Sequence, residues 1–187
     1  MRKLVVSEFV TLDGVMEAPG GEPTHPHTGW VGELFGDGIL RYKLDEILGA
    51  ESLLVGRVTY ESFAGAWPER EGEMADKLNT MRKDVVSSTL RDPEWANSRV
   101  IDPAGLVDAV GALKAGDAGP ILVHGSATLV HALLLEGLVD ELRLMVFPVS
   151  IGDGLRVFPS ERTKLSWTLA SHEVLDDGVL ALSYTPV

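Results

Sequence analysis

Two hydrophobic patterns take turns along the chain. Short apolar runs such as Leu53–Val55 predict buried strands, while apolar residues three and four apart, as over Ala127–Glu136, predict helices with one buried face. Because strands and helices alternate through the middle of the chain, we expect a mostly parallel sheet. The predicted strands are Lys3–Val10, Leu53–Val55, Lys83–Ser87, Arg99–Ile101, Ile121–His124, Glu141–Val149, Leu165–Val174 and Val179–Thr185. The predicted helices are Asp37–Leu48, one that begins over Tyr60–Phe63, Glu69–Met81 (as a helix or a lid), Pro103–Ala115 and Ala127–Glu136.

Turn and capping residues set the ends of these elements. Asp37 is the expected N-cap of its helix, and Gly49 is the expected glycine just past its end. Asp177-Gly178 lies between the last two strands and predicts a hairpin. The Gly- and Pro-rich stretch Thr11–Gly21 opens a long irregular loop, a feature that is often functional. We therefore expect one α/β domain over residues 1–187, with an antiparallel hairpin added to a mostly parallel sheet.

Composition narrows the class of protein. The chain has 187 residues, of which 45% are apolar, so it suits one globular domain with a sizeable core. A formal net charge of −12 makes nucleic acids and anionic membranes unfavourable partners. The absence of cysteine excludes disulfides and thiolate sites and fits a reducing compartment such as the cytoplasm. No apolar run is long enough to span a bilayer, and MRKLVVSEFV alternates in polarity, so it predicts a first strand and not a signal peptide.

One stretch, LLVGRVTYESF, combines a buried strand end with a helix start. Gly56 separates the two, which places free backbone N–H groups where a phosphate is readily bound. Arg57 adds a fork of donors and Thr59 adds a hydroxyl. The alternative is an ordinary strand–helix turn with a solvent-facing arginine.

Two further strand ends carry similar chemistry. Ser87 and Thr89 follow one strand, and Gly125, Ser126 and Ala127 follow another and open a helix. In an open α/β sheet, ligands bind beyond the carboxyl ends of the strands, so three such junctions together indicate a nucleotide cleft.

Other catalytic templates are missing from the sequence. It contains no dinucleotide-binding glycine fingerprint, no P-loop, no nucleophile elbow and no zinc-protease motif. His25 and His27 form an H-x-H pair without a third ligand, which is more typical of exposed loop residues than of a metal site, so we expect no metal. The lack of a nucleophile or metal cage fits hydride transfer from a soluble cofactor.

The sequence resembles the dihydrofolate-reductase-like superfamily, and within it the branch that includes the reductase domain of bacterial riboflavin biosynthesis. The segments that carry the resemblance are VSEFVTLDGVME, LLVGRVTYESFAGAWP, VVSSTL and ILVHGSATLVHALLLEGLVDELRLMVFPVSIGDGLRVFP. The resemblance implies a single-domain fold with helices on both faces of the sheet and a site for NADPH. It assigns Gly56, Arg57 and Thr59 to the cofactor phosphates, Ser87 and Thr89 to the adenosine side, Gly125, Ser126 and Ala127 to the turn under the pyrophosphate and nicotinamide, and Asp13 and Gly14 to the loop over the nicotinamide.

The sequence departs from dihydrofolate reductases at two places. His124-Gly125 stands where those enzymes carry a Gly-Gly pair, and His124 faces either the core or the ring of the ligand. Their substrate-orienting carboxylate has no counterpart at a matching distance from Gly56. The nearest candidates are Asp37 and Glu33, and an N-cap is the alternative role of Asp37. Trp30 and Phe35 are placed either to stack on a planar heterocycle or to pack in the core.

These observations lead to one main functional hypothesis, an NADPH-dependent reductase. Its expected substrate is a small heterocycle, such as a 5-amino-6-(5-phosphoribosylamino)uracil-like or pterin-like compound. A non-catalytic dinucleotide-binding module and a purely structural or partner-binding domain are the alternatives. The apolar alternation of Leu142–Val149 adds the expectation of a homodimer.

Overall fold

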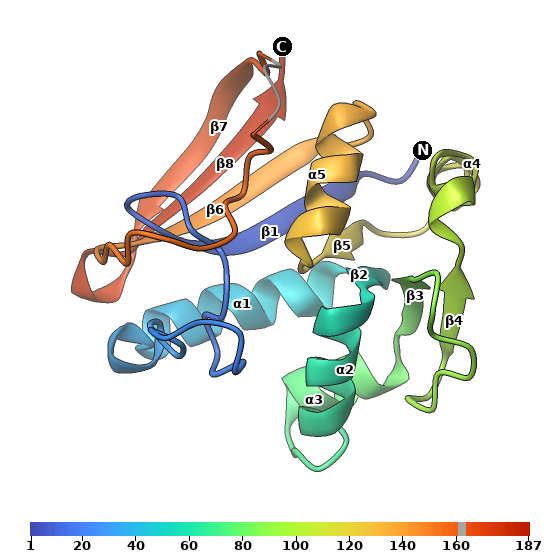
Figure 1. Cartoon of the computed structure of the whole chain (residues 1–187), viewed down its shortest axis with the longest axis horizontal. Coiled ribbons are helices and arrows are strands. Elements are labelled where there is room, and N and C mark those ends of the chain that lie inside the picture. Colours follow the sequence, from blue (N-terminus) through green and yellow to red (C-terminus); the bar gives the residue numbers. More distant parts are fainter. Residues whose placement is uncertain (161–163) are drawn as a thin grey trace.

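A computed structural model describes residues 1–160 and 164–187, and the strands of this part of the chain form one sheet (Figure 1). The order across the sheet is β4-β3-β2-β5-β1-β6-β8-β7. The strands are β1 (Leu4–Thr11), β2 (Ser52–Gly56), β3 (Arg82–Val86), β4 (Ser98–Ile101), β5 (Ile121–Val123), β6 (Glu141–Phe147), β7 (Trp167–Val174) and β8 (Leu180–Pro186).

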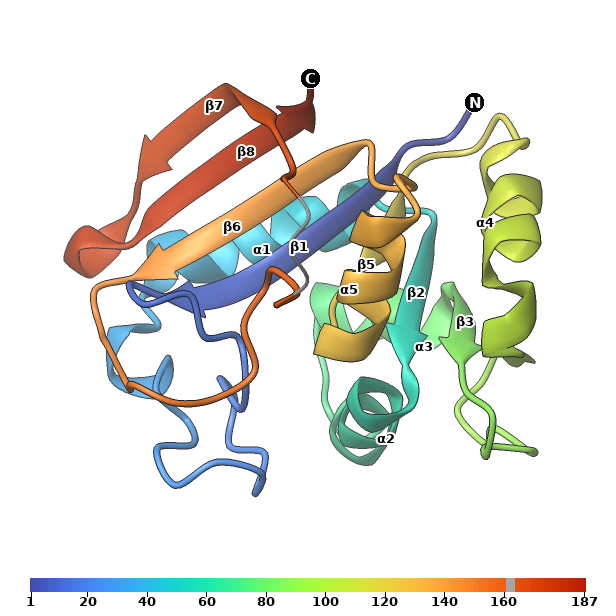
Figure 2. The same ribbon diagram turned by 45° about the horizontal axis from the view of Figure 1, so that its top comes forward.

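The sheet is parallel from β4 to β6 and antiparallel beyond. Strand β8 pairs antiparallel with β6, and β7 pairs antiparallel with β8 (Figure 2). The turn between β7 and β8 contains Asp177 at φ 53° and Gly178 at φ 78°. These positive φ values suit a tight hairpin turn, so the hairpin predicted from Asp-Gly is confirmed.

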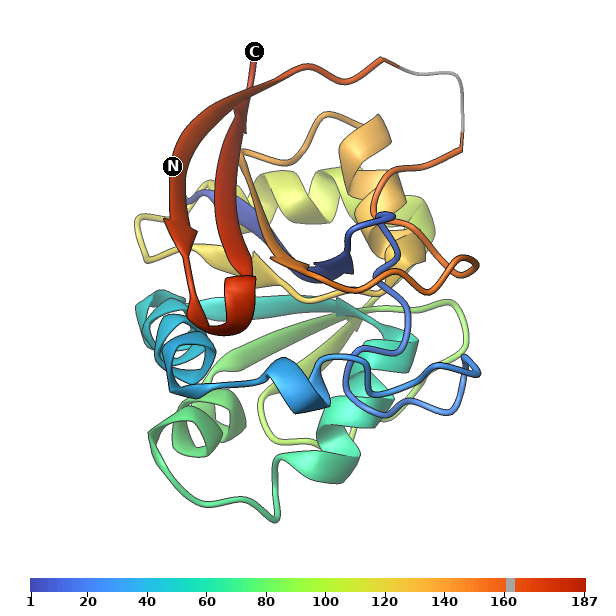
Figure 3. The same ribbon diagram turned by 90° about the vertical axis from the view of Figure 1, so that its left-hand side faces the viewer.

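Helices cover both faces of the sheet, as predicted (Figure 3). They are α1 (Asp37–Gly49), α2 (Arg57–Ala66), α3 (Glu73–Thr80), α4 (Leu106–Lys114) and α5 (Ala127–Leu135). Helices α4 and α5 pack on one face, and α1, α2 and α3 pack on the other. Side chains alternate along β1 accordingly: Val6 joins the cluster under α4 and α5, and Val5 joins the cluster over α1 to α3. Within the described residues, no helix has both the length and the apolar character needed to cross a membrane.

The ends of α1 differ from the prediction. Gly36, and not Asp37, is the N-cap, because a carboxylate from the distant β7–β8 hairpin supplies the cap: Asp176 Oδ2 accepts from the Gly38 N–H at 2.6 Å. At the other end Gly49 is still helical, and Ala50 is the C-cap. The capping roles predicted for Asp37 and Gly49 are therefore wrong, although the helix begins at Asp37 as predicted and ends only one residue later than predicted.

Helix α2 begins three residues earlier than the Tyr60 start predicted from the sequence. Gly56 has extended backbone angles (φ −76°, ψ 161°) and is the N-cap, so Arg57 is the first helical residue. Arg57, Val58 and Thr59 thus form the first helical turn and not a loop. This change brings the free N–H groups of the helix closer to the end of β2.

Strand β3 also fixes the end of α3. Lys83 is fully buried, and its Nζ donates to the carbonyl oxygens of Leu78 and Met81, both at 2.7 Å, and to that of Asn79 at 3.3 Å. The ammonium lies 4.3 Å from the centre of the Trp95 ring. A buried cation therefore satisfies the carbonyl groups that the last turn of a helix leaves without partners.

Candidate functional site

Two strand–helix junctions meet at the carboxyl end of the sheet, one after β2 and one after β5. The Gly56 N–H donates to the Gly125 carbonyl at 3.1 Å. A Cβ on Gly56 would lie 2.3 Å from Ser126 Oγ, and a Cβ on Gly125, which has φ +65°, would lie 2.9 Å from Thr59 Oγ1. Ser126 leaves no room for a Cβ on Gly56, and the positive φ of Gly125 together with the Thr59 hydroxyl favours glycine at the second position. The structure thus brings four of the predicted cofactor residues together.

Each junction opens a helix toward the same edge of the sheet. Gly56 is the N-cap of α2 and Ser126 is the N-cap of α5, and neither makes a side-chain capping bond. Among residues 1–160 and 164–187, no side chain or carbonyl caps the first-turn N–H groups of either helix, including that of Ala127, so these groups can donate to an external acceptor. Both helix dipoles add positive potential at this place, which favours an anion such as a phosphate.

Arg57 stands at the start of α2 and is exposed. Its Nη1 donates to both carboxylate oxygens of Glu61, at 3.0 and 2.7 Å, one helical turn later. The two side chains are 43% and 51% exposed, so solvent screens this pair and it adds little to stability. The guanidinium therefore lies beside the Gly56 junction, and breaking its contact with Glu61 costs little free energy.

Ser87 and Thr89 lie one strand further from Gly125, because β3 pairs with the side of β2 that faces away from β5. The buried Ser87 Oγ accepts from the N–H groups of Thr89 and Leu90 at 3.1 and 2.9 Å. Its hydroxyl thus closes the turn after β3. Thr89 is exposed and lies on the surface beyond this turn.

Asp13 joins the first loop to the loop after β6. Its Oδ1 accepts from Thr11 Oγ1 at 2.5 Å, and its Oδ2 accepts from the Gly152 N–H at 2.7 Å. These hydrogen bonds, that from Thr11 first, hold the pKa of Asp13 well below its usual range. Gly14 follows at φ +82°, and Arg156 Nη1 donates to the Asp13 carbonyl. The residues predicted to cover the nicotinamide are therefore held in place by a second loop.

The predicted substrate residues lie around the start of α1. Asp37 is exposed in the first helical turn, at the end of α1 that lies beside the β7–β8 hairpin (Figure 1). Trp30 packs edge-on against Phe147 at 5.5 Å, and its Nε1 donates to the Glu17 carbonyl at 2.8 Å, so its ring belongs to the core. Phe35 is 39% exposed and meets Phe9 edge-on at 6.0 Å, which leaves it the more accessible of the two rings.

Sequence reasoning did not find a buried carboxyl under the Gly125 turn. Glu8 on β1 is only 9% exposed, and its Oε1 accepts from the Gly125 N–H at 2.5 Å. Burial raises the pKa of Glu8 to about 8. A polar Ser7-Glu8 pair inside an otherwise apolar strand was the available signal, since a polar side chain in a buried strand needs a specific partner.

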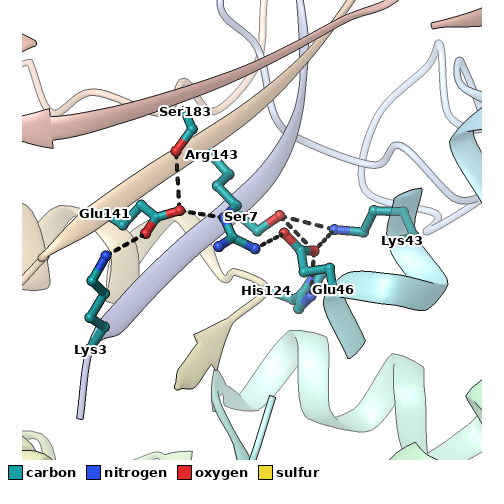
Figure 4. Close-up of polar contacts among 8 residues, drawn as sticks. All are labelled: Lys3, Ser7, Lys43, Glu46, His124, Glu141, Arg143 and Ser183. Atoms are coloured by element: carbon teal, nitrogen blue, oxygen red, sulfur yellow. Dashed lines mark hydrogen bonds and ion pairs between the residues drawn. The ribbon is translucent and has the colours of Figure 1, made fainter. Parts of the chain in front are cut away.

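A second buried polar cluster lies on the α1 face, centred on Glu46 (Figure 4). Its Oε2 contacts Lys43 Nζ, accepts from Ser7 Oγ at 2.9 Å and lies 3.7 Å from His124 Nε2. Its Oε1 accepts from Arg143 Nη1 at 3.3 Å. Burial alone would raise the pKa of Glu46, but the charge of Lys43 and these hydrogen bonds lower it to about 2. Glu46 is thus a carboxylate at neutral pH.

His124 faces this cluster, on the α1 side of the sheet. Burial, together with the charge of Lys43, lowers its pKa to about 3, so the imidazole is neutral. Its Nε2 has no hydrogen-bond partner among the described residues, and its ring centre lies 6.3 Å from that of Phe63. The histidine that replaces the first glycine of the expected pair therefore stands beside both the polar cluster and α2.

The H-x-H pair lies in the long loop. His25 Nε2 lies 3.0 Å from the Asp153 carbonyl oxygen, and His25 Nδ1 accepts from the His27 N–H at 3.0 Å. In the two described ranges, no group of three or more His, Cys, Asp or Glu side chains is arranged to hold a metal ion. Hydrogen bonds with Asp153 and His27 account for the position of His25.

Comparison with known proteins gives matches across the whole fold. The uncharacterized protein YyaP of Bacillus subtilis (strain 168) is 23% identical over 192 residues, covering 98% of this chain and 94% of that protein. A putative riboflavin biosynthesis protein from Shewanella sp. PV-4 has a TM-score of 0.70 at 17% identity, covering 99% of both chains. Dihydrofolate reductase from Enterococcus faecalis, in complex with NADP(H), has a TM-score of 0.63 at 14% identity, covering 98% of this chain and 96% of that one.

The Thermotoga maritima diaminohydroxyphosphoribosylaminopyrimidine deaminase/5-amino-6-(5-phosphoribosylamino)uracil reductase has a TM-score of 0.64 at 15% identity; the match covers all of this chain and 57% of that protein. These likenesses show a dihydrofolate-reductase-like fold, as predicted. The family model of the RibD C-terminal domain matches residues 2–181. The chain therefore belongs to the RibD C-terminal domain family.

Proposed function

We propose that this protein is an NADPH-dependent reductase that acts on a small heterocycle, such as a 5-amino-6-(5-phosphoribosylamino)uracil-like or pterin-like compound. One observation carries the proposal: the Gly56 and Gly125 turns pack backbone to backbone, so that two helix N-termini open at one edge of the sheet. This arrangement suits a ligand with more than one phosphate. The family match and the fold shared with reductases favour this ligand and this chemistry.

The residues of the junctions fit such a cofactor. The free N–H groups at the start of α5 would hold the diphosphate, with Ser126 at the N-cap. Arg57 would exchange Glu61 for the 2′-phosphate that distinguishes NADPH from NADH. When bound, NADPH supplies a hydride from its nicotinamide ring. Asp13 and Gly14 would then close the loop over that ring.

The substrate would lie on the α1 side of the carboxyl edge. Phe35 offers an accessible aromatic face there, and His124 brings a neutral imidazole beside the Gly125 turn. Asp37, exposed in the first turn of α1, is the carboxylate that we propose to orient the substrate. We further propose that the protein is a homodimer. We also propose that its reaction belongs to riboflavin biosynthesis.

Cofactor selectivity tests the proposal. Arg57→Ala removes one charge-assisted contact, worth about 1.5–3 kcal/mol, so NADPH affinity should fall about ten- to a hundredfold while NADH affinity stays unchanged. Glu61→Gln is the matched control, because it frees Arg57 and should leave NADPH binding equal or tighter. Titration calorimetry gives both affinities, and an equal loss for NADPH and NADH in Arg57→Ala contradicts the role in binding the 2′-phosphate.

Turnover is tested separately from binding. A reductase should oxidise NADPH, followed by absorbance at 340 nm, with at least one member of a panel of pterins and aminopyrimidines. Thermal stabilisation by NADPH without oxidation across the panel would identify a non-catalytic dinucleotide-binding module. No stabilisation by either dinucleotide would exclude both functions.

A further inference from the structure

Glu8 is a buried acid that touches the backbone of the cofactor turn. It alternates along β1 with Val6 and Val10, both of which belong to the core cluster under α5, so it points to the α5 face of the sheet. Its carboxyl oxygen accepts from the Gly125 N–H at 2.5 Å. This bond ties the centre of the sheet to the turn from which α5 begins.

The charged side chains that act on Glu8 pair with each other and not with Glu8. From α1, Lys43 favours its ionised form and Glu46 opposes it, and these two side chains pair with each other. From β5, His124 is neutral, and from β6, Leu144 stands opposite Glu8 in register. Within residues 1–160 and 164–187, Glu8 forms no ion pair. Burial therefore outweighs the Gly125 hydrogen bond, and the pKa of Glu8 rises to about 8.

Resting on the proposed function, we propose that Glu8 is a positioning residue for the Gly125 turn and that it takes up a proton from solvent when the cofactor diphosphate binds. The physical reason is charge repulsion in a buried site: a carboxylate under the turn would oppose a diphosphate at the start of α5. The protonated carboxyl still accepts from the Gly125 N–H through its carbonyl oxygen, so the turn keeps its shape.

Proton uptake can be measured directly on the wild-type chain. NADH is the first probe, because it lacks the 2′-phosphate and so adds no ionisable group near neutral pH. Titration calorimetry at pH 8 in HEPES and in Tris, which differ in ionisation enthalpy and contain no competing phosphate, should give an uptake of about half a proton per NADH bound, and in suitable phosphate-free buffers the uptake should fall toward zero at pH 6. Affinity should be about tenfold weaker at pH 9 than at pH 7, because more Glu8 must then be neutralised.

Two variants separate Glu8 from other groups. Glu8→Gln keeps a carbonyl oxygen for the Gly125 N–H but cannot ionise, so it should bind NADH at pH 7 within about threefold of wild type, with no proton uptake at pH 8 and no loss of affinity up to pH 9. Glu136→Gln, at the exposed end of α5, should behave as wild type in every respect.

The outcomes distinguish this inference from the proposed function. Binding of NADH and NADPH without proton uptake at pH 8, or uptake that persists in Glu8→Gln, overturns the inference and leaves the cofactor assignment standing. Absence of binding to either dinucleotide at every pH refutes the proposed function and this inference with it. If Glu8→Gln fails to fold, the proton uptake of the wild-type chain on NADH binding and its dependence on pH still test the inference.

Discussion

Replacing Gly56 by alanine tests the close approach on which the candidate site depends. The added Cβ would lie 2.3 Å from Ser126 Oγ and 3.1 Å from both the Cβ and the backbone nitrogen of Ser126. The hydroxyl can rotate away, but the other two atoms move only if the whole turn before α5 shifts. We therefore expect Gly56→Ala both to destabilise the fold and to spread the two helix N-termini.

The expected size follows from this overlap. Overpacking of a close contact costs about 1–3 kcal/mol, which for a chain of this length lowers Tm by about 2–12 °C. Gly65→Ala is the matched control in the same helix, since a Cβ there meets no atom within 4 Å. It should raise stability by about 0.5–1 kcal/mol, because alanine loses less backbone entropy than glycine in a helix. The two substitutions are thus expected to act in opposite directions.

Thermal unfolding by circular dichroism measures the stability, and titration calorimetry with NADPH measures the site. Adding Ser126→Gly to Gly56→Ala removes two of the three close contacts and should recover part of the lost Tm. A Gly56→Ala variant with unchanged Tm and unchanged NADPH affinity would refute the reasoning, because a Cβ would then fit between the two turns without the overlap seen in the structure.

Two further predictions concern buried charged and titratable groups. Lys83→Met should cost about 3 kcal/mol, since it leaves the last carbonyls of α3 without donors, whereas Lys77→Met on the same helix should change stability by less than about 0.5 kcal/mol; urea unfolding compares them. His124 has a pKa lowered to about 3 in the fold, so the unfolded chain binds its proton first and the wild type loses stability as pH falls from about 6.5 toward 3. His124→Gln should reduce this loss between pH 7 and 5, and an unchanged pH profile would show that the imidazole is not held neutral.

Local pattern was enough to predict most of the architecture. Apolar runs and helical spacing located the strands and helices, and Asp177-Gly178 located the hairpin, because these signals act between residues close in sequence. The same holds for the junctions at Gly56 and Gly125, where a glycine separates a buried strand from a helix. Their convergence followed from a general property of parallel sheets, in which the carboxyl ends of the strands share an edge.

Helix ends were predicted less well, for a physical reason. Asp37 has the right chemistry for an N-cap, but Asp176 supplies the carboxylate from 138 residues away in the chain. Sequence spacing cannot reveal such a partner, because it depends on how the β7–β8 hairpin folds over α1. Only the folded chain decides which of two suitable aspartates caps the helix.

The sequence by itself determined the order of the elements, the mostly parallel sheet and the glycine turns at its edge. The tertiary structure alone decided the polar interior: that Glu8 meets the Gly125 N–H, and that Glu46 meets Arg143 from 97 residues away. The reason is that periodicity predicts which face of an element is buried, whereas the pairing of buried charges depends on strand register and on the position of α1 across the sheet.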